Sequence, residues 1–228
     1  MVLCVKTCIG ICTQLALFAA LIFLPIGTFD WSMGKIWLQV FACAAAVSSA
    51  YLLLARPAAL EARMRAKPAA QAPADRLAFS LMAAALALPI MFAAKDVFDW
   101  QIFGIADPKV QAMGMAVFLL GFVITFLSML HNEYAAPTIH IQKEAGHRLA
   151  DSGLYGMLRH PMYLGFILFT AGTCLFLGSY AATAFSLLAL TASAIYRIQI
   201  EEKTLARDLP GYSDYISRVK WRLLPFIY

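Results

Sequence analysis

The sequence predicts an all-α integral membrane protein with about six transmembrane helices. The chain of 228 residues is 62% hydrophobic and only 14% charged, whereas soluble domains are about 45–50% apolar and about 25% charged. Along the chain, apolar stretches long enough to cross a bilayer alternate with shorter polar segments. Most of the protein is therefore expected to lie in lipid.

Six spans can be placed in chain order. They cover residues 8–27, 35–55, 77–94, 110–130, 161–177 and 181–198. The fifth span is short, and the turn Gly178-Ser179-Tyr180 joins it directly to the sixth, which predicts a C-terminal helical hairpin. We divide the chain into residues 1–109, with three spans and their loops, and residues 110–228, with the functional core and a tail that carries no further span.

The distribution of basic residues predicts the orientation in the membrane. Six spans place both termini on the same side, and 15 of the 18 Lys and Arg residues then fall on that side. Cytoplasmic loops carry an excess of Lys and Arg. Both termini and the longest polar segment, residues 131–160, are therefore expected in the cytoplasm.

Several function classes find no support in the sequence. The net charge of +5 is not organised as a basic run interleaved with aromatic residues, so it points to topology and lipid headgroups instead of nucleic acid. No P-loop, G-x-G-x-x-G or G-x-S-x-G motif occurs. No convergent His/Cys spacing indicates a metal site.

Cys4, Cys8 and Cys12 recur every four residues and therefore share one face of the first helix. Such a stripe is compatible with a soft-metal site or with acylation. Because no histidine or carboxylate accompanies the cysteines, we interpret them as small hydrophobic packing residues.

The polar chemistry concentrates in the stretch Gly153–Gly165. It contains Arg159, His160 and Pro161, and proline suits the first turn of a helix that continues as the fifth span. The N–H groups at such a helix start favour an anion. The alternative interpretation is an interfacial belt of Arg, His and Tyr, which is common at helix ends.

The hairpin should bring the end of the sixth span beside His160. Arg197 and Glu201 lie four residues apart and share a helix face, whereas Glu202 points about 100° away. The alternative interpretations are an ordinary helix salt bridge for Arg197 and Glu201 and a solvated carboxylate for Glu202. His131 and His140 are interpreted as interfacial histidines.

The pattern from about Asn132 to Phe226 resembles the isoprenylcysteine carboxyl methyltransferase family and the related phospholipid N-methyltransferases. The residues that carry the resemblance are His147-Arg-Leu-Ala, Gly153-x-Tyr155, Arg159-His160-Pro161-x-Tyr163-x-Gly165, Arg197-x-x-x-Glu201-Glu202 and the tail motif Leu209-Pro-Gly-Tyr212. The first 110 residues resemble the family only in hydrophobicity and in a tryptophan-flanked first hairpin.

The resemblance implies that S-adenosylmethionine is the methyl donor and that it binds in a cytosolic pocket closed by the tail. The implied donor-binding positions are Gln142, His147, Leu149, Ala150 (where valine is usual), Tyr155, His160, Pro161, Met162, Tyr163 and Glu201. From their charge and place in the chain we add Arg159 and Glu202. Arg197 is the position that faces the methyl acceptor, and Asn132 lies near the acceptor entrance, so Arg197, Glu201 and Asn132 form the expected catalytic set.

The chemistry of these residues agrees with that assignment. Glu201 or Glu202 can pair with a cation of the donor, His160 and the helix start can hold its carboxylate, and Tyr155 and Tyr163 offer ring faces to the adenine or sulfonium. A carboxylate acceptor needs no base, and Arg197 would orient it by a bidentate contact. An amine acceptor would need Glu201 or Glu202 as a base.

We therefore expect an integral, multi-pass membrane methyltransferase whose active site faces the cytoplasm. Its acceptor would be lipophilic and would enter from the bilayer, with the carboxylate of a prenylated cysteine or a similar hydrophobic acid favoured. The alternatives are a phospholipid amine N-methyltransferase, a related membrane reductase using a nicotinamide, and a non-catalytic membrane scaffold. Membrane lipids are the other expected partners, and the sequence does not indicate an oligomeric state.

Overall fold

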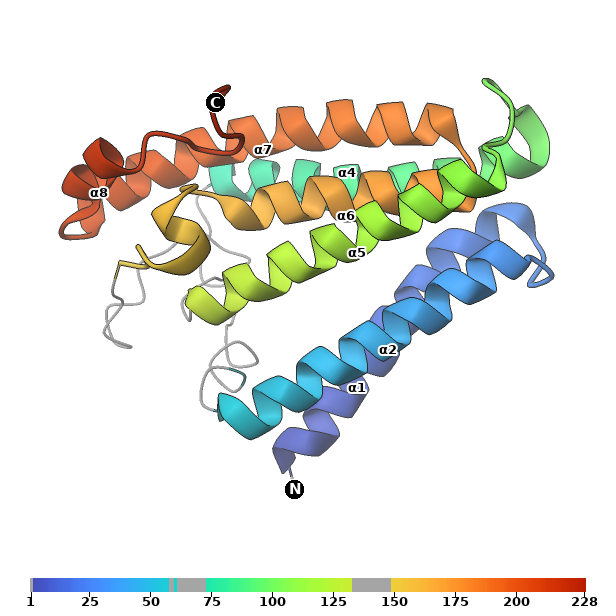
Figure 1. The fold of residues 1–228 in the computed structure, drawn as a ribbon, viewed down its shortest axis with the longest axis horizontal. Coiled ribbons are helices and arrows are strands. Elements are labelled where there is room, and N and C mark those ends of the chain that lie inside the picture. Colours follow the sequence, from blue (N-terminus) through green and yellow to red (C-terminus); the bar gives the residue numbers. More distant parts are fainter. Residues whose placement is uncertain (1, 58–59, 61–72, 133–148) are drawn as a thin grey trace.

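The computed structural model describes residues 2–57, 60, 73–132 and 149–228, which form a bundle of long helices (Figure 1). The helices are α1 (Val2–Phe23), α2 (Ser32–Ala55), α4 (Pro73–Lys95), α5 (Pro108–His131), α6 (Pro161–Leu177), α7 (Tyr180–Asp208) and α8 (Tyr212–Arg218). Short 3-10 helices, η1 (Leu24–Ile26) and η4 (Gly153–Gly156), and a π-helical turn, η2 (Asp96–Trp100), lie between them.

The six predicted spans all correspond to helices, which confirms the all-α membrane fold and its C-terminal hairpin. Helices α1, α2, α4, α5 and α7 are long and apolar enough to cross a membrane, and α6 is a shorter apolar helix of 17 residues. The sixth span was predicted to end at residue 198, but α7 continues to Asp208. Residues 199–208 contain no Gly or Pro, and Pro210-Gly211 then ends the helix.

The helix ends gather at two poles of the bundle. Figure 1 shows the start of α1, the ends of α2, α5 and α7, the starts of α4 and α6, and α8 toward one pole. The connections α1–α2, α4–α5 and α6–α7 lie at the other. This is the arrangement expected of an even number of spans, and it collects the polar residues of α6, α7 and the tail at one pole.

Helices α5 and α6 approach so closely that their backbones touch, and glycine makes this contact sterically allowed. Gly114 and Gly121 of α5 face Gly165 and Gly172 of α6. A Cβ atom at Gly121 would lie 2.7 Å from the Gly165 carbonyl oxygen, and one at Gly172 would lie 2.7 Å from the Gly114 carbonyl oxygen. Small residues are the usual means by which membrane helices associate without a hydrophobic driving force. This contact fixes where α6 begins, and hence where His160 lies.

Substituting Gly172 with alanine is expected to destabilise the protein by about 1–3 kcal/mol, because the added methyl group meets backbone atoms of α5 that cannot move aside cheaply. The matched control is Gly10→Ala on α1, where an added Cβ meets no atom within 4 Å. Thermal unfolding in detergent should show a lower Tm for Gly172→Ala and an unchanged or higher Tm for Gly10→Ala. Equal Tm values for the two variants would contradict the close contact.

Aromatic side chains fill the space where α1, α2, α5 and α6 meet. Trp37 is fully buried and stacks on Phe41 at 5.3 Å between ring centroids. The Trp37 indole Nε1 donates to Thr173 Oγ1 (3.1 Å), so its polar edge is satisfied inside the bundle. The N-terminal hairpin is thereby anchored to α6.

A buried carboxylate holds the turn at the pole opposite the polar cluster. Asp96 is 1% exposed, and its Oδ2 accepts from Ser179 Oγ (2.6 Å) while its Oδ1 accepts from the Ile102 amide (3.0 Å). Ser179 also caps α7 by accepting from the Ala182 amide (2.9 Å). The tight turn predicted at residues 178–180 is confirmed, with Gly178 at φ +106°. The connection 95–109, predicted as a loop, contains the π-helical turn η2.

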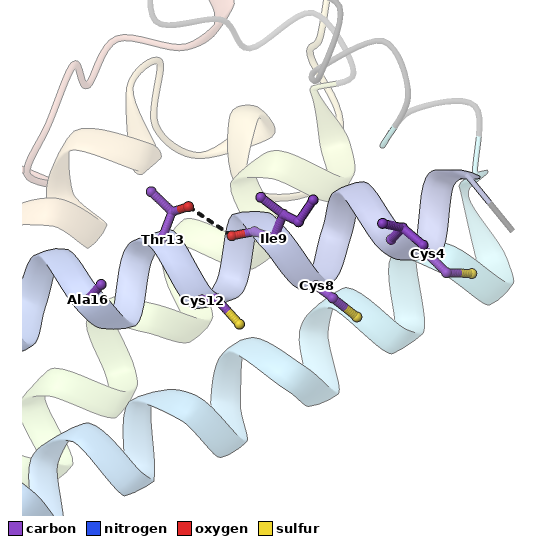
Figure 2. Close-up of a pocket in the computed structure, with 7 residues that line it drawn as sticks. Cys4, Cys8, Ile9, Cys12, Thr13 and Ala16 are labelled. Atoms are coloured by element: carbon purple, nitrogen blue, oxygen red, sulfur yellow. Dashed lines mark hydrogen bonds between the residues drawn. The ribbon is translucent and has the colours of Figure 1, made fainter.

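The cysteine stripe of α1 faces outward. Cys4, Cys8 and Cys12 are exposed and line an apolar groove with Thr13 and Ala16 (Figure 2). The shared helix face is confirmed, and the three side chains lie outside the buried core of the described residues. Only Cys174 is buried among the five cysteines, all of which lie in the described part of the chain. In a membrane, the groove on α1 meets lipid or another helix.

Candidate functional site

The predicted functional residues meet where α6 begins and α7 ends. As expected, Pro161 occupies the first turn of α6, and His160 is the residue that precedes it. The C-terminal tail crosses this point and is held by main-chain hydrogen bonds. The Arg159 amide donates to the Trp221 carbonyl and the His160 amide to the Arg222 carbonyl, each at 2.9 Å. The tail therefore forms one wall of the site.

Glu202 lies at the centre of a cluster of basic side chains. Its Oε1 accepts from His160 Nε2 (3.2 Å) and lies 3.0 Å from Arg159 Nε, and its Oε2 accepts from Arg222 Nε (2.9 Å). The Glu202 side chain is 11% exposed. The interpretation of Glu202 as a solvated carboxylate is therefore wrong. Its charge is used to hold α6 and the tail against α7.

Glu201 has a different environment, although it is the next residue. Its Oε2 accepts a short hydrogen bond from the Tyr163 hydroxyl (2.6 Å) and lies 4.0 Å from His160 Nδ1. Its side chain is 26% exposed, more than twice that of Glu202. Because it is less buried and carries fewer cationic neighbours, Glu201 is the carboxylate better placed to receive a cationic ligand.

The Tyr163 hydroxyl connects Glu201 with Arg197. Arg197 Nε donates to this hydroxyl at 3.0 Å, and the hydroxyl in turn donates to Glu201. The prediction that His160 and the Arg197–Glu201 face meet in space is confirmed. The prediction that Tyr163 offers its ring face to the adenine or sulfonium did not anticipate this bridging role of the hydroxyl.

Arg197 also reaches a carboxylate from the N-terminal half of the chain. Its Nη1 lies 3.4 Å from Asp75 Oδ1, and both side chains are 5% exposed. Asp75 is in the first turn of α4, 122 residues away in sequence. The ion pair of Arg197 therefore joins α7 to α4, in contrast to a salt bridge confined to one helix.

A second layer of the site is built from η4, the end of α5 and α8. The Tyr215 hydroxyl donates to the Tyr155 carbonyl (2.7 Å), which ties α8 to η4. Asn132 Nδ2 lies 3.5 Å from the Tyr155 hydroxyl, at the limit of a hydrogen bond. Leu149 packs against the cluster of Leu209, Tyr212, Tyr215 and Val219. Those of the residues predicted from the resemblance that the structure describes thus come together from separate segments of the chain.

Two buried donor groups beside Glu202 make no hydrogen bond within the described structure. They are Arg159 Nε, which is close to Glu202 but poorly aligned, and the hydroxyl of Tyr212, a residue only 3% exposed. Burial first, and then the charges of Glu202 and Glu201, raise the pKa of Tyr212, which keeps the hydroxyl protonated. Buried polar groups are nearly always hydrogen-bonded in native proteins, so each such group calls for a partner.

The other predicted residues lie as follows. Pro161 is buried, and Leu149, Ala150, Met162 and Asn132 are half-buried. His131 is exposed, and its Nδ1 donates to the Leu127 carbonyl of its own helix (2.8 Å). Gln142, His147 and His140 lie outside the described residues.

Sequence reasoning missed two residues of this site, Asp75 and Arg222, and it gave no site role to Tyr212, although the tail motif that contains Tyr212 was part of the resemblance. Asp75 is the first acid after a strongly basic segment, at the start of a span, and an acid at that place is a signal for a buried ion pair. Arg222 and Tyr212 lie in the charged, aromatic tail. Nothing in the local sequence of Arg222 distinguishes it from the tail residues that face solvent.

Comparisons with known proteins agree with this geometry. Residues 112–207 match the isoprenylcysteine carboxyl methyltransferase (ICMT) family. The solved structure of a eukaryotic intramembrane Ras methyltransferase, ICMT, is similar over 93% of this chain and 73% of its own, with a TM-score of 0.56 and 19% identity. At this identity the likeness supports the fold.

Curated relatives include two kinds of enzyme. A probable protein-S-isoprenylcysteine O-methyltransferase of Oryza sativa subsp. indica is 32% identical over 52% of this chain and 62% of its own length. The protein-S-isoprenylcysteine O-methyltransferase of Schizosaccharomyces pombe is 34% identical over 34% of each chain. The Delta(14)-sterol reductase TM7SF2 of Mus musculus is 32% identical over 39% of this chain and 22% of its own length.

This chain thus spans between about a fifth and three fifths of the length of these relatives. The family match begins in α5 and ends in α7, so it contains Tyr155, His160, Tyr163, Arg197 and Glu201. The predicted resemblance to the isoprenylcysteine carboxyl methyltransferase family is therefore confirmed over residues 112–207 of this membrane protein.

Proposed function

We propose that this chain is a membrane methyltransferase that uses S-adenosylmethionine to methylate the carboxylate of a prenylated cysteine or a similar hydrophobic acid. The observation that carries the proposal is the bridge from Arg197 through the Tyr163 hydroxyl to Glu201. It joins a cation suited to an acid acceptor with a carboxylate suited to a cationic donor, inside the segment that matches the family.

The residues present fit the donor. It supplies a methyl group on a sulfonium and also carries an ammonium, a carboxylate and an adenine. The hydroxyl of Tyr212 and Arg159 Nε, both without a hydrogen-bond partner in the described structure, are donors that a carboxylate would satisfy. His160 and the start of α6 lie beside them.

Glu201 is the residue that we assign to the cationic part of the donor. Glu202 already contacts Arg159, Arg222 and His160, so a further cation would have to displace one of them. Glu201 holds one hydrogen bond from Tyr163 and is partly exposed. Glu202 then acts as a positioning residue that fixes His160 and the tail.

Arg197 would hold the acceptor carboxylate in line with the transferable methyl group. Methyl transfer to a carboxylate is a displacement at carbon that needs no general base, so alignment supplies most of the rate enhancement. A planar guanidinium fixes the direction of a carboxylate better than an ammonium does. Asn132, beside Tyr155, is the remaining member of the proposed catalytic set.

The proposed side of the reaction is the cytoplasm. With six spans, the sequence assigns 15 of its 18 basic residues to the side of the membrane that carries the site, and the positive-inside rule makes that side the cytoplasm. The lipophilic part of the acceptor would reach Arg197 laterally from the bilayer. We also propose that the C-terminal tail closes the pocket in which the methyl donor binds.

Titration of the purified full chain in detergent with S-adenosylmethionine tests the proposal most directly. Saturable binding by calorimetry is expected, followed by transfer of a labelled methyl group to N-acetylated S-farnesylcysteine. The product should be a methyl ester, which mild alkali hydrolyses with release of labelled methanol. Binding without transfer to this acid would leave the donor assignment intact and overturn the acceptor assignment.

A membrane reductase is the second candidate, because the sterol reductase relative matches a substantial part of this chain. The same protein should therefore be titrated with reduced and oxidised nicotinamide dinucleotides. Preferential binding of a nicotinamide would favour the reductase over the transferase. Absence of binding to either ligand would favour the scaffold interpretation.

A further inference from the structure

Asp75 is a buried acid in the part of the chain that the family match does not cover. It is only 3% exposed and lies in the first turn of α4, whereas the match begins at residue 112. Its carboxylate faces Arg197 across the interface between α4 and α7. A carboxylate buried inside a protein is costly unless its charge is compensated, so its presence calls for a role.

The contact with Asp75 holds one corner of the Arg197 guanidinium. Nη1 lies 3.4 Å from Asp75 Oδ1, and Nε donates to the Tyr163 hydroxyl at 3.0 Å. The guanidinium is planar, so contacts on two different nitrogens fix the orientation of the whole plane. Tyr163 supplies one of these contacts from α6, and Asp75 supplies the other from α4.

The contact between Asp75 and Arg197 also determines the electrostatic environment that a ligand meets at the Arg197 guanidinium. The Arg197 and Asp75 side chains are each 5% exposed, so solvent and salt screen their interaction little. A second carboxylate that approaches Arg197 meets the attraction of the guanidinium and the repulsion of Asp75. The repulsion disappears when the second carboxylate becomes a neutral ester.

We propose that Asp75 is a positioning and specificity residue: it orients Arg197 toward the acceptor carboxylate and weakens the grip of Arg197 on that carboxylate. The inference rests on the proposed function, since it takes Arg197 as the acceptor's partner. Asp75 would thereby limit how strongly the acid is preferred over its ester. Arg197 would then align the acceptor carboxylate for the reaction but would bind it less tightly than an arginine without Asp75 beside it.

The test compares binding of N-acetylated S-farnesylcysteine with binding of its methyl ester, without methyl donor, to the full chain in detergent. In Asp75→Asn the acid should bind roughly threefold to tenfold more tightly than in wild type, because the competing charge is gone. The ester should bind as before. With donor present, kcat should fall roughly tenfold because the guanidinium is no longer held in one orientation.

Asp30→Asn is the matched control, because Asp30 is a 96% exposed acid that pairs with Lys35. It belongs to the connection between α1 and α2, which lies at the other pole (Figure 1). Its ratio of acid to ester affinity and its kcat should equal those of wild type. Asp75→Glu keeps the charge but displaces it by one methylene. It should leave the affinity ratio near the wild-type value while kcat still falls, and it replaces Asp75→Asn if that variant does not fold.

The outcomes separate the inference from the function on which it rests. If wild type methylates the acid but Asp75→Asn shows the wild-type affinity ratio and kcat, Asp75 has no role in positioning. Equal losses of acid and ester binding in a folded Asp75→Asn would make Asp75 a purely structural residue and overturn the inference. If wild type neither prefers the acid nor methylates it, the proposed function itself fails.

Discussion

Replacement of Arg197 by lysine should lower kcat for the acid acceptor by roughly two orders of magnitude while leaving donor affinity almost unchanged. Lysine keeps the positive charge but cannot contact Asp75 and the Tyr163 hydroxyl from two nitrogens of one rigid plane. Arg197 is not a donor ligand in the proposed site, so calorimetry with S-adenosylmethionine should give a wild-type Kd. Transfer of a labelled methyl group to N-acetylated S-farnesylcysteine measures kcat.

Arg207→Lys is the control for this substitution, because Arg207 lies on the same helix but is 73% exposed and paired with its neighbour Asp208. It should show wild-type turnover. Arg197→Gln distinguishes the two acceptor classes, since the loss of the cation would relieve repulsion of a protonated amine. Robust methylation of phosphatidylethanolamine by Arg197→Gln, together with no methylation of the cysteine analogue by wild type, would establish the phospholipid assignment in place of ours.

Alanine at Glu201 or at His160 should each weaken S-adenosylmethionine binding tenfold or more, about 1.4 kcal/mol, which is the scale of a lost charge-assisted hydrogen bond. Glu201 would lose the contact to the cationic part of the donor, and His160 the contact to its carboxylate. Calorimetry on the purified, folded variants gives the change in Kd. Lys203→Ala, an exposed position next to the two glutamates, is the control and should bind normally.

Glu202→Gln tests the assignment of Glu201, and not Glu202, as the carboxylate that binds the donor. Glu202 compensates the charges of Arg159 and Arg222, so its neutralisation should lower Tm. The Kd for the donor should change little. A stable Glu202→Gln protein that binds no donor, beside a Glu201→Ala protein with wild-type affinity, would reverse the roles of the two carboxylates.

Features set by local sequence were predictable. Apolar stretches located the five long helices and the shorter α6 of the described residues, and Pro161 located the start of α6 because proline suits a first helical turn. Gly178 and Ser179 likewise located the hairpin turn. The end of α7 was placed ten residues too early, because charge ended the apolar pattern while helix-forming residues continued to Asp208.

Features set by tertiary contact were not predictable in the same way. The bond from Tyr163 to Glu201 depends on the direction of one side chain at a helix crossing, and the pair of Asp75 with Arg197 depends on which face α4 presents to α7. The cysteine spacing identified a shared face of α1, but which way that face points is decided by the packing of α1 on α2. The glycine contact was a missed signal, since Gly114 and Gly121, and again Gly165 and Gly172, are seven residues apart.

The main-chain hydrogen bonds between the tail and the start of α6 affect which substitutions the tail can tolerate. The bonds from Arg159 and His160 to residues 221 and 222 join main-chain atoms only, so any side chain at Trp221 that preserves the local backbone keeps them. Arg222 differs, because its side chain also reaches Glu202. Substitutions should therefore be tolerated better at position 221, whose ring contacts the exposed Phe226, than at position 222, although the two residues are neighbours in the tail.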